Sequence, residues 1–221
     1  MSLDLVISSK PSEDTLALME NRRLIELHKE KSNNNFSVGD IYLKKKKKVM
    51  PGLNAAFVDV GYSKDAFLHY LDLGPNFASL NKYVHGVMTG KVKTSSLKNF
   101  KFEAEINKDG KMPDLLKQNQ NVLVQIAKEP ISTKGPRLSS ELSLAGRYMV
   151  LVPFSNRISV SQKIRNFEEK DRLKRLIKSI RPEGFGVIVR TVAENKKVAD
   201  LHADLQDLVD KWEECFKQLK K

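Results

Sequence analysis

Two short apolar runs joined by a polar turn constrain the fold more than any other part of this sequence. The first run, residues 55–60, ends at Gly61, and the second run, residues 66–70, follows the polar residues 62–65. A Pro-Gly pair at 51–52 precedes the first run. Because Gly permits positive φ and Pro cannot continue a strand ladder, these residues mark strand ends. The stretch therefore predicts two β-strands with a tight connection.

Each predicted strand carries one phenylalanine, and five consecutive lysines lie shortly before them. The phenylalanines are Phe57 and Phe67, and the lysines occupy positions 44–48. Rings on adjacent strands can stack on bases while ammonium groups hold phosphates, which is the surface that single-stranded nucleic acid needs. The alternative is that both rings belong to the core of a small barrel and the lysines form a solvated edge. Spacing alone leaves both interpretations open.

The excess of basic residues indicates a polyanionic partner. The 221-residue chain has a formal net charge of +12, which favours nucleic acid or an anionic membrane surface. It contains no apolar run of about 18 residues, and its first residues lack the pattern of a signal peptide. The single cysteine, Cys215, allows no intrachain disulfide and no cysteine zinc site within the chain. We expect a cytoplasmic protein without a membrane span.

The N-terminal part alternates between short apolar runs and turns. Residues 3–8, 15–19 and 24–28 predict a three-stranded meander, which is too small to bury both of its faces alone. Residues 31–36 have the composition of a linker, and residues 38–49 predict the next strand.

The middle of the chain has a weaker pattern. Residues 74–117 are rich in Lys, Asn, Ser and Gly, which predicts a partly ordered surface insertion, with a lysine-bearing flap over a nucleic-acid groove as the functional alternative. Residues 121–127 predict a strand, and we expect residues 128–134 to be the segment that follows it in the same barrel.

The C-terminal third mixes strands with two helices. Residues 138–153 contain two strand-like runs around Gly146, and residues 185–191 predict a further strand. Asn166 is a good N-cap for a helix to residue 179, with Phe167 and Leu173 on its apolar face. Residues 195–220 predict a long amphipathic helix. Its apolar stripe comprises Val198, Leu201, Leu205, Leu208, Trp212, Cys215 and Leu219.

The strings PGLNAAFVDVG and DAFLHYLDLGP resemble the RNA-binding barrel of the bacterial ribonuclease E/G family, and the resemblance covers nearly the whole chain apart from the insertion. It implies an α+β fold in three parts. Residues 1–35 would be a partial RNase H-like meander, and residues 36–137 a five-stranded OB-fold barrel of the ribosomal-protein-repeat type, enlarged at 74–117. Residues 138–221 would be an α/β 5′-sensor region that ends in a long helix.

The same resemblance implies an RNA-binding surface on the barrel. Phe57 and Phe67 match the family's RNA-stacking residues, and Lys134, followed by Gly135, matches the Lys-Gly pair that borders the RNA path. Lys44, Lys45 and Lys46 stand where the family usually has Gly, a basic residue and Val, so the added charge favours RNA affinity.

An Arg-Thr pair at a strand end combines a planar fork of donors with a hydroxyl, which suits a terminal phosphate. The alternative is an arginine salt-bridged at a strand edge. The string PEGFGVIVRT resembles the family's 5′-sensor, which implies that Arg190 and Thr191 grip the 5′-monophosphate of RNA. By the same resemblance the backbone N–H of Val150 adds a contact, and Gly146 packs against the first nucleotide. Gln162 and Lys163 replace a pair of arginines common in the family.

The residues give no sign of a catalytic site. The acidic and histidine residues are scattered, with no spacing that argues for a shared metal or a base–nucleophile pair. The resemblance implies that the family holds Mg²⁺ with paired aspartates and binds zinc between subunits with a cysteine pair. Both metal sites would lie in a domain beyond residue 221.

We therefore predict no catalytic residue, metal or cofactor in this chain. Its expected function is to bind single-stranded RNA and sense its 5′-monophosphate, as the N-terminal portion of an endoribonuclease that is a homo-oligomer and acts in RNA processing and decay. The alternatives are a stand-alone, non-catalytic RNA-binding protein and membrane-surface attachment through the basic terminal helix.

Overall fold

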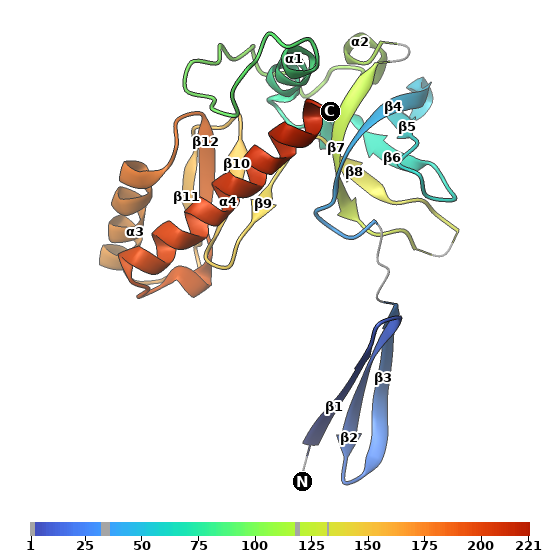
Figure 1. The fold of residues 1–221 in the computed structure, drawn as a ribbon, viewed down its shortest axis with the longest axis vertical. Coiled ribbons are helices and arrows are strands. Elements are labelled where there is room, and N and C mark those ends of the chain that lie inside the picture. The colour runs from blue at the N-terminus through green and yellow to red at the C-terminus, as the bar shows by residue number, and fades with distance from the viewer. Residues whose placement is uncertain (1–2, 32–35, 118–119, 132) are drawn as a thin grey trace. The chain divides into compact units, whose positions relative to one another are not determined.

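The computed structural model describes residues 3–31, 36–117, 120–131 and 133–221, which form two compact units, residues 1–37 and 38–221 (Figure 1). The first unit is an antiparallel meander of β1 (Leu3–Lys10), β2 (Glu13–Glu20) and β3 (Arg23–Lys31). Each strand contains one of the predicted runs. The expected linker falls largely on residues 32–35, outside the described residues.

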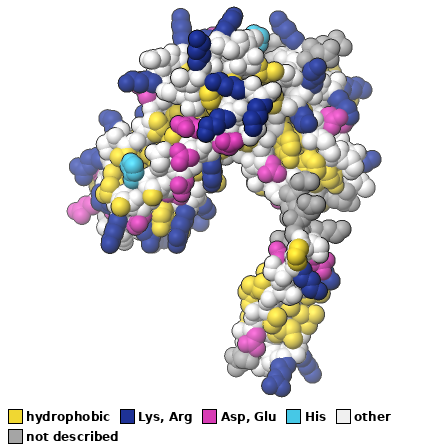
Figure 2. All heavy atoms as spheres, in the orientation of Figure 1, with side chains coloured by type: hydrophobic (Ala, Val, Ile, Leu, Met, Phe, Trp, Pro, Cys, Tyr) yellow, Lys and Arg dark blue, Asp and Glu magenta, His cyan; other side chains and the backbone are white. Residues whose placement is uncertain are grey.

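The meander leaves its apolar side chains in contact with solvent. No described residue of β1 or β2 is buried, and Leu3, Leu5 and Ile7 are 62%, 61% and 61% exposed. Figure 2 shows hydrophobic side chains gathered over this sheet. A three-stranded sheet has too little chain to cover either face, which confirms the expectation from its length.

The second unit begins with a closed five-stranded barrel in the order β4-β5-β6-β8-β7. Small and branched side chains alternate into its interior, where Ala56, Val58 and Leu68 are fully buried. β4 closes the barrel because its first half pairs with β7 and its second half with β5. The strands are β4 (Ile41–Met50), β5 (Ala55–Val58), β6 (Ala66–His69), β7 (Asn121–Lys128) and β8 (Arg137–Ser139).

The fifth barrel strand begins only after the segment 128–134. β8 begins at Arg137, Lys128 still belongs to β7, and the described residues after Lys128 contribute the isolated bridge between Ile131 and Lys134. Pro130 lies within this segment and Pro136 follows it, and both lack the N–H group that a continuous ladder requires.

The segment 74–117 contributes a buried helix to the core, so the prediction of a surface insertion was wrong for this helix, although most side chains of residues 89–111 lie at the surface. It contains α1 (Phe77–Met88) and α2 (Met112–Leu115). In α1 the residues at helical spacing, Leu80, Tyr83 and Val87, are at most 3% exposed. The sequence analysis did not identify this apolar stripe, because the stripe occupies only one helix face and the segment as a whole is polar.

A second sheet, in the order β11-β12-β10-β9, follows the barrel. β11 runs parallel to β12, and the other pairs are antiparallel. Asn166 caps the helix after this sheet by accepting the Glu169 N–H at 3.1 Å, as predicted, but Phe167 is 79% exposed and not on the apolar face. The elements are β9 (Leu144–Ala145), β10 (Met149–Pro153), β11 (Ile158–Val160), α3 (Phe167–Ile180), β12 (Phe185–Val189) and α4 (Val198–Leu219).

One hydrophobic core joins α1, α4 and the second sheet. Tyr83 lies at its centre, with its ring centroid 5.4 Å from that of Phe154 and 5.5 Å from that of Trp212. The Trp212 indole N–H donates to the Ser95 carbonyl at 2.8 Å, which ties the long helix to the loop after α1. Half-buried Cys215 packs against this core, and burial raises the pKa of its thiol to about 11.

Tyr83 offers a test of this core. Its hydroxyl is buried without a hydrogen-bond partner among the described residues, and burial raises its pKa. An unpaired buried hydroxyl costs about 1–3 kcal/mol. We expect Tyr83→Phe to keep or increase the free energy of unfolding in urea titrations, by up to about 1 kcal/mol, and a large loss of stability would show that the hydroxyl is paired.

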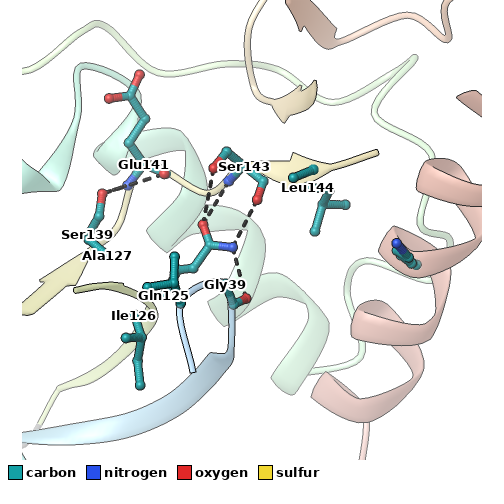
Figure 3. A pocket seen from close by; sticks show the side chains of 11 residues that line it. Gly39, Gln125, Ile126, Ala127, Ser139, Glu141, Ser143 and Leu144 are labelled. Atoms are coloured by element: carbon teal, nitrogen blue, oxygen red, sulfur yellow. Dashed lines mark hydrogen bonds between the residues drawn. The ribbon is translucent and has the colours of Figure 1, made fainter. Parts of the chain in front are cut away.

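Gln125 joins the barrel to the second sheet (Figure 3). Its side-chain nitrogen donates to the carbonyls of Gly39 at 3.0 Å and Ser143 at 2.9 Å, and its oxygen accepts the Ser143 N–H at 2.9 Å. The side chain is 6% exposed, so these bonds fix the segment that leads from β8 into β9. The pocket beside it, about 540 Å³, is lined by one acidic and one basic side chain, Glu141 and Lys211.

Candidate nucleic-acid interface and phosphate site

Phe57 and Phe67 form an aromatic pair on the outer face of the barrel. They are direct partners across β5 and β6, with ring centroids 5.8 Å apart in an edge-to-face arrangement. Both are half-buried, whereas their strand neighbours Val58 and Leu68 are fully buried. The rings therefore do not belong to the barrel interior, and the sequence-based alternative that placed them there was wrong.

A groove of about 750 Å³ opens beside the two rings. Gly135 shapes one wall, because a Cβ at this position would collide with the Asp65 carbonyl oxygen. This close approach brings Lys134 to the groove next to the rings. The residues that line the groove are Phe57, Lys64, Asp65, Phe67, Lys128, Thr133, Lys134, Gly135 and Arg137.

Two of the charges around this groove are already paired. Arg137 donates two hydrogen bonds to the Asp72 carboxylate, at 2.9 and 3.1 Å, which raise the pKa of the guanidinium. Asp65 accepts from Lys47 at 2.8 Å. Lys64, Lys128 and Lys134 are exposed, so the groove offers ammonium groups beside aromatic rings.

Only a part of the lysine run at residues 44–48 lies near the two rings. A register shift between Lys46 and Lys48 places Lys48 directly opposite Phe57. Lys44 and Lys45 instead pair with β7, opposite Val122 and Asn121. The structure therefore brings Lys48, a residue that sequence reasoning did not single out, to the rings.

Lys46 points to another part of the protein. Its ammonium donates to the Leu116 carbonyl at 2.7 Å, and partial burial lowers its pKa. The structure thus uses Lys46 to hold the segment after α2 against the barrel. Strand residues alternate between faces, and a bulge follows Lys46. The lysines that are adjacent in the sequence therefore lie on different faces of the barrel, which the sequence alone did not reveal.

A second group of donors lies at the end of β12. The guanidinium of exposed Arg190 donates to the Gly146 carbonyl at 2.8 Å, and its backbone N–H donates to the Tyr148 carbonyl at 2.8 Å. The hydroxyls of Thr191 and Ser161 lie 3.0 Å apart, because β11 and β12 are parallel and end side by side. This pairing also brings the chain that continues into Gln162 and Lys163 to the same end of the sheet.

Asp204 on α4 organises the turn that holds Gly146. Its carboxylate accepts the backbone N–H groups of Arg147, Tyr148 and Met149 at 2.8, 2.9 and 3.1 Å. A Cβ at Gly146 would lie 2.6 Å from a carboxylate oxygen of Asp204, so only glycine fits there without displacement. Sequence reasoning missed Asp204, since no local motif reveals a contact between residues more than 50 positions apart.

Val150 is placed differently from the other predicted phosphate ligands. It lies inside the second sheet, paired with Ala145 on one side and Ile188 on the other. The structure thus joins Arg190 to Gly146 directly, whereas Val150 belongs to the adjacent ladder.

Arg190 and its neighbours suit a small anion. Among the described residues no ion pair involves Arg190, so the alternative of a salt-bridged arginine has no support. A planar guanidinium oriented by a carbonyl, together with two hydroxyls, offers several donors to phosphate oxygens.

The described part of the chain shows no group of three or more His, Cys, Asp or Glu residues that could hold a metal ion. No helix within the described ranges is long and apolar enough to span a bilayer.

The fold is a mixed α+β structure in which a closed five-stranded barrel and a four-stranded sheet share one unit, with exposed basic side chains at each candidate site. Residues 143–221 match the model of the Ribonuclease E/G family, and relatives named ribonuclease G and ribonuclease E align with most or all of the chain. The chain belongs to the ribonuclease E/G family.

Among individual relatives, ribonuclease G of Escherichia coli (strain K12) is 33% identical over 221 residues, which is 100% of this chain and 41% of the relative. Ribonuclease G of Haemophilus influenzae is 32% identical over 220 residues, again 100% of this chain and 41% of the relative. Ribonuclease E of Synechocystis sp. is 36% identical over 183 residues, 82% of this chain and 23% of the relative. The chain thus spans less than half the length of these relatives.

Proposed function

We propose that this chain is the RNA-binding and 5′-end-sensing portion of a ribonuclease E/G-type endoribonuclease. In this proposal the barrel is an OB-fold that binds single-stranded RNA, and the second sheet with α3 and α4 is a sensor for a 5′-monophosphate. The meander β1–β3 is part of an RNase H-like subdomain, which agrees with its exposed apolar side chains.

The observation that carries the RNA-binding proposal is the outward pair of Phe57 and Phe67 beside a basic groove. Base stacking on such rings is tolerant of sequence, and ammonium groups supply phosphate contacts that weaken with salt. The names of the relatives, ribonuclease G and ribonuclease E, support RNA as the nucleic acid.

The proposed 5′-sensor consists of Arg190 and Thr191, with Gly146 beside them and Val150 in the adjoining strand. A guanidinium and hydroxyls that satisfy the oxygens of one phosphate leave the extra charge of a triphosphate without partners, while a 5′-hydroxyl offers the guanidinium no anionic partner. The site therefore favours a 5′-monophosphate over both other ends.

Fluorescence anisotropy with matched single-stranded oligoribonucleotides that carry a 5′-monophosphate or a 5′-hydroxyl tests the proposal. We expect tighter binding of the phosphorylated strand, and for both strands a steep decrease of affinity with salt. Equal affinity for both ends would refute the sensor, and a failure to bind either strand at low salt would refute RNA binding itself.

Asp204→Ala tests how the phosphate site is held. Removal of the carboxylate leaves three N–H groups of the 147–149 turn without their partner and releases the Gly146 carbonyl that orients Arg190. We expect most of the preference for 5′-phosphorylated RNA to be lost while the affinity for 5′-hydroxyl RNA stays unchanged.

The matched control for this variant is Asp207→Ala, which removes an exposed carboxylate from the same helix. It should keep the full preference for the phosphorylated strand. A variant at 204 with unaltered preference would show that the turn keeps its geometry without the carboxylate.

A further inference from the structure

A second groove, of about 740 Å³, lies on the α1 side of the barrel. It is bounded by the C-terminal half of α1, by α2 and by the start of β7. No acidic side chain is among the described residues that line it, in contrast to the three other grooves of comparable size. Its lining comprises Asn81, Val84, His85, Met88, Thr89, Leu115, Lys117, Gln120 and Asn121.

The half of the lysine run that does not reach the rings flanks this groove. Ile41 and Leu43 pack against the core on the α1 side, and strand alternation puts Lys45 on the same face of β4. Lys45 is the direct partner of Asn121, which lines the groove. The backbone of β4 is also tied to the rim, since the Lys46 N–H donates to the Gln120 carbonyl at 3.2 Å.

The charge around the groove is positive. Exposed Lys117 lines it, exposed Lys45 lies beside it, and exposed Lys91 and Lys93 follow α1 in the chain. Figure 2 shows Lys and Arg side chains gathered over the region of α1 and the C-terminal end of α4. Clustered cations with no acid among the described lining residues attract a polyanion, although exposed Asp114 lies on α2 at the boundary.

The lining also suits a nucleobase. Asn81, Gln120 and Asn121 carry amide groups of the kind that the edges of unpaired bases require. The Gln120 oxygen accepts the Lys117 N–H at 2.9 Å, and the Asn121 nitrogen donates to the Met88 sulfur at 3.7 Å. These bonds leave the Gln120 nitrogen and the Asn121 oxygen to face a base. Val84 and half-exposed Met88 provide apolar surface against which the face of a base can lie. Phosphate-binding cations and base-edge partners thus occur in one groove.

We propose that this groove is a second subsite for single-stranded RNA, which binds a part of the same strand that lies on Phe57 and Phe67. The inference rests on the proposed RNA binding by the barrel. β4 connects the two sites, because Lys48 faces the rings and Lys45 faces the groove, roughly 10 Å away at about 3.3 Å per strand residue. A strand a few nucleotides longer than the ring groove requires reaches both sites.

The test is the salt dependence of binding for 5′-hydroxyl oligoribonucleotides of about 4 and about 12 nucleotides, lengths within the range bound by a single barrel of this type. Each phosphate contact to single-stranded nucleic acid contributes about 0.7 to the slope of log affinity against log salt. For the double variant Lys45→Ala with Lys117→Ala we expect the slope for the longer strand to fall by about 1.4, and the shorter strand to bind as it does to the parent.

A control double variant, Lys174→Ala with Lys178→Ala, removes two exposed lysines from α3 and should leave both slopes unchanged. An unaltered slope for the longer strand in the groove variant would overturn the subsite, and so would an equal loss for both lengths. If the parent binds neither length, the RNA-binding function itself is wrong, whereas binding of both lengths with no effect of Lys45 and Lys117 rejects only the second subsite.

Discussion

Replacement of both Phe57 and Phe67 by alanine is expected to weaken binding of single-stranded RNA by about 2–6 kcal/mol, since a base stacked on an aromatic ring contributes about 1–3 kcal/mol. The two rings contact each other, with centroids 5.8 Å apart, so the effects of the single variants need not add. The loss should be the same for 5′-phosphorylated and 5′-hydroxyl strands, because the rings lie on the barrel and Arg190 on the second sheet. Fluorescence anisotropy at fixed salt measures it.

Phe167→Ala is the matched control, since it deletes a phenylalanine that is 79% exposed on α3. RNA affinity should be unchanged in this variant. Urea unfolding of the double variant should show an intact fold, because both rings are only half-buried. Affinity equal to that of the parent would place the RNA elsewhere on the protein.

The strands around residues 55–70 could be predicted because their signals are local, whereas spacing alone left open whether Phe57 and Phe67 face outward. Residues 55–60 and 66–70 carry strand-forming residues between Gly and Pro, and β5 and β6 lie within them. The N-cap at Asn166 is equally local. In contrast, the burial of α1 depends on partners such as Phe154 and Trp212 that are far away in the chain, and a polar segment gives no sign of them.

The candidate sites show the same division. The residue types of Arg190 and Thr191 suggested a phosphate site, and the structure adds Ser161 from the parallel strand and Asp204 from α4. For the lysine run, the sequence shows a block of charge, whereas the bulge between Lys46 and Lys48 distributes its members over different faces. A bulge changes which side chains share a surface. A run of identical residues contains no signal that shows where the bulge lies.

Replacement of Arg190 by alanine is expected to abolish the preference for 5′-monophosphorylated over 5′-hydroxyl RNA. Hydrogen bonds to a charged partner contribute about 1.5–3 kcal/mol each, so the loss corresponds to about a 10- to 150-fold decrease in affinity for the phosphorylated strand. Affinity for the 5′-hydroxyl strand should stay at the level of the parent, because that strand has no terminal phosphate for Arg190 to bind. Anisotropy titrations with both strands measure the ratio.

Arg190→Lys separates charge from geometry, because lysine keeps the positive charge but lacks the planar fork that also donates to the Gly146 carbonyl. We expect it to restore only a part of the preference. The control is Arg175→Ala on α3, which removes an arginine whose side chain is 75% exposed and should bind both strands as the parent does. If Arg190→Ala retained the full preference, the end of β12 would not be the phosphate site, whatever the barrel binds.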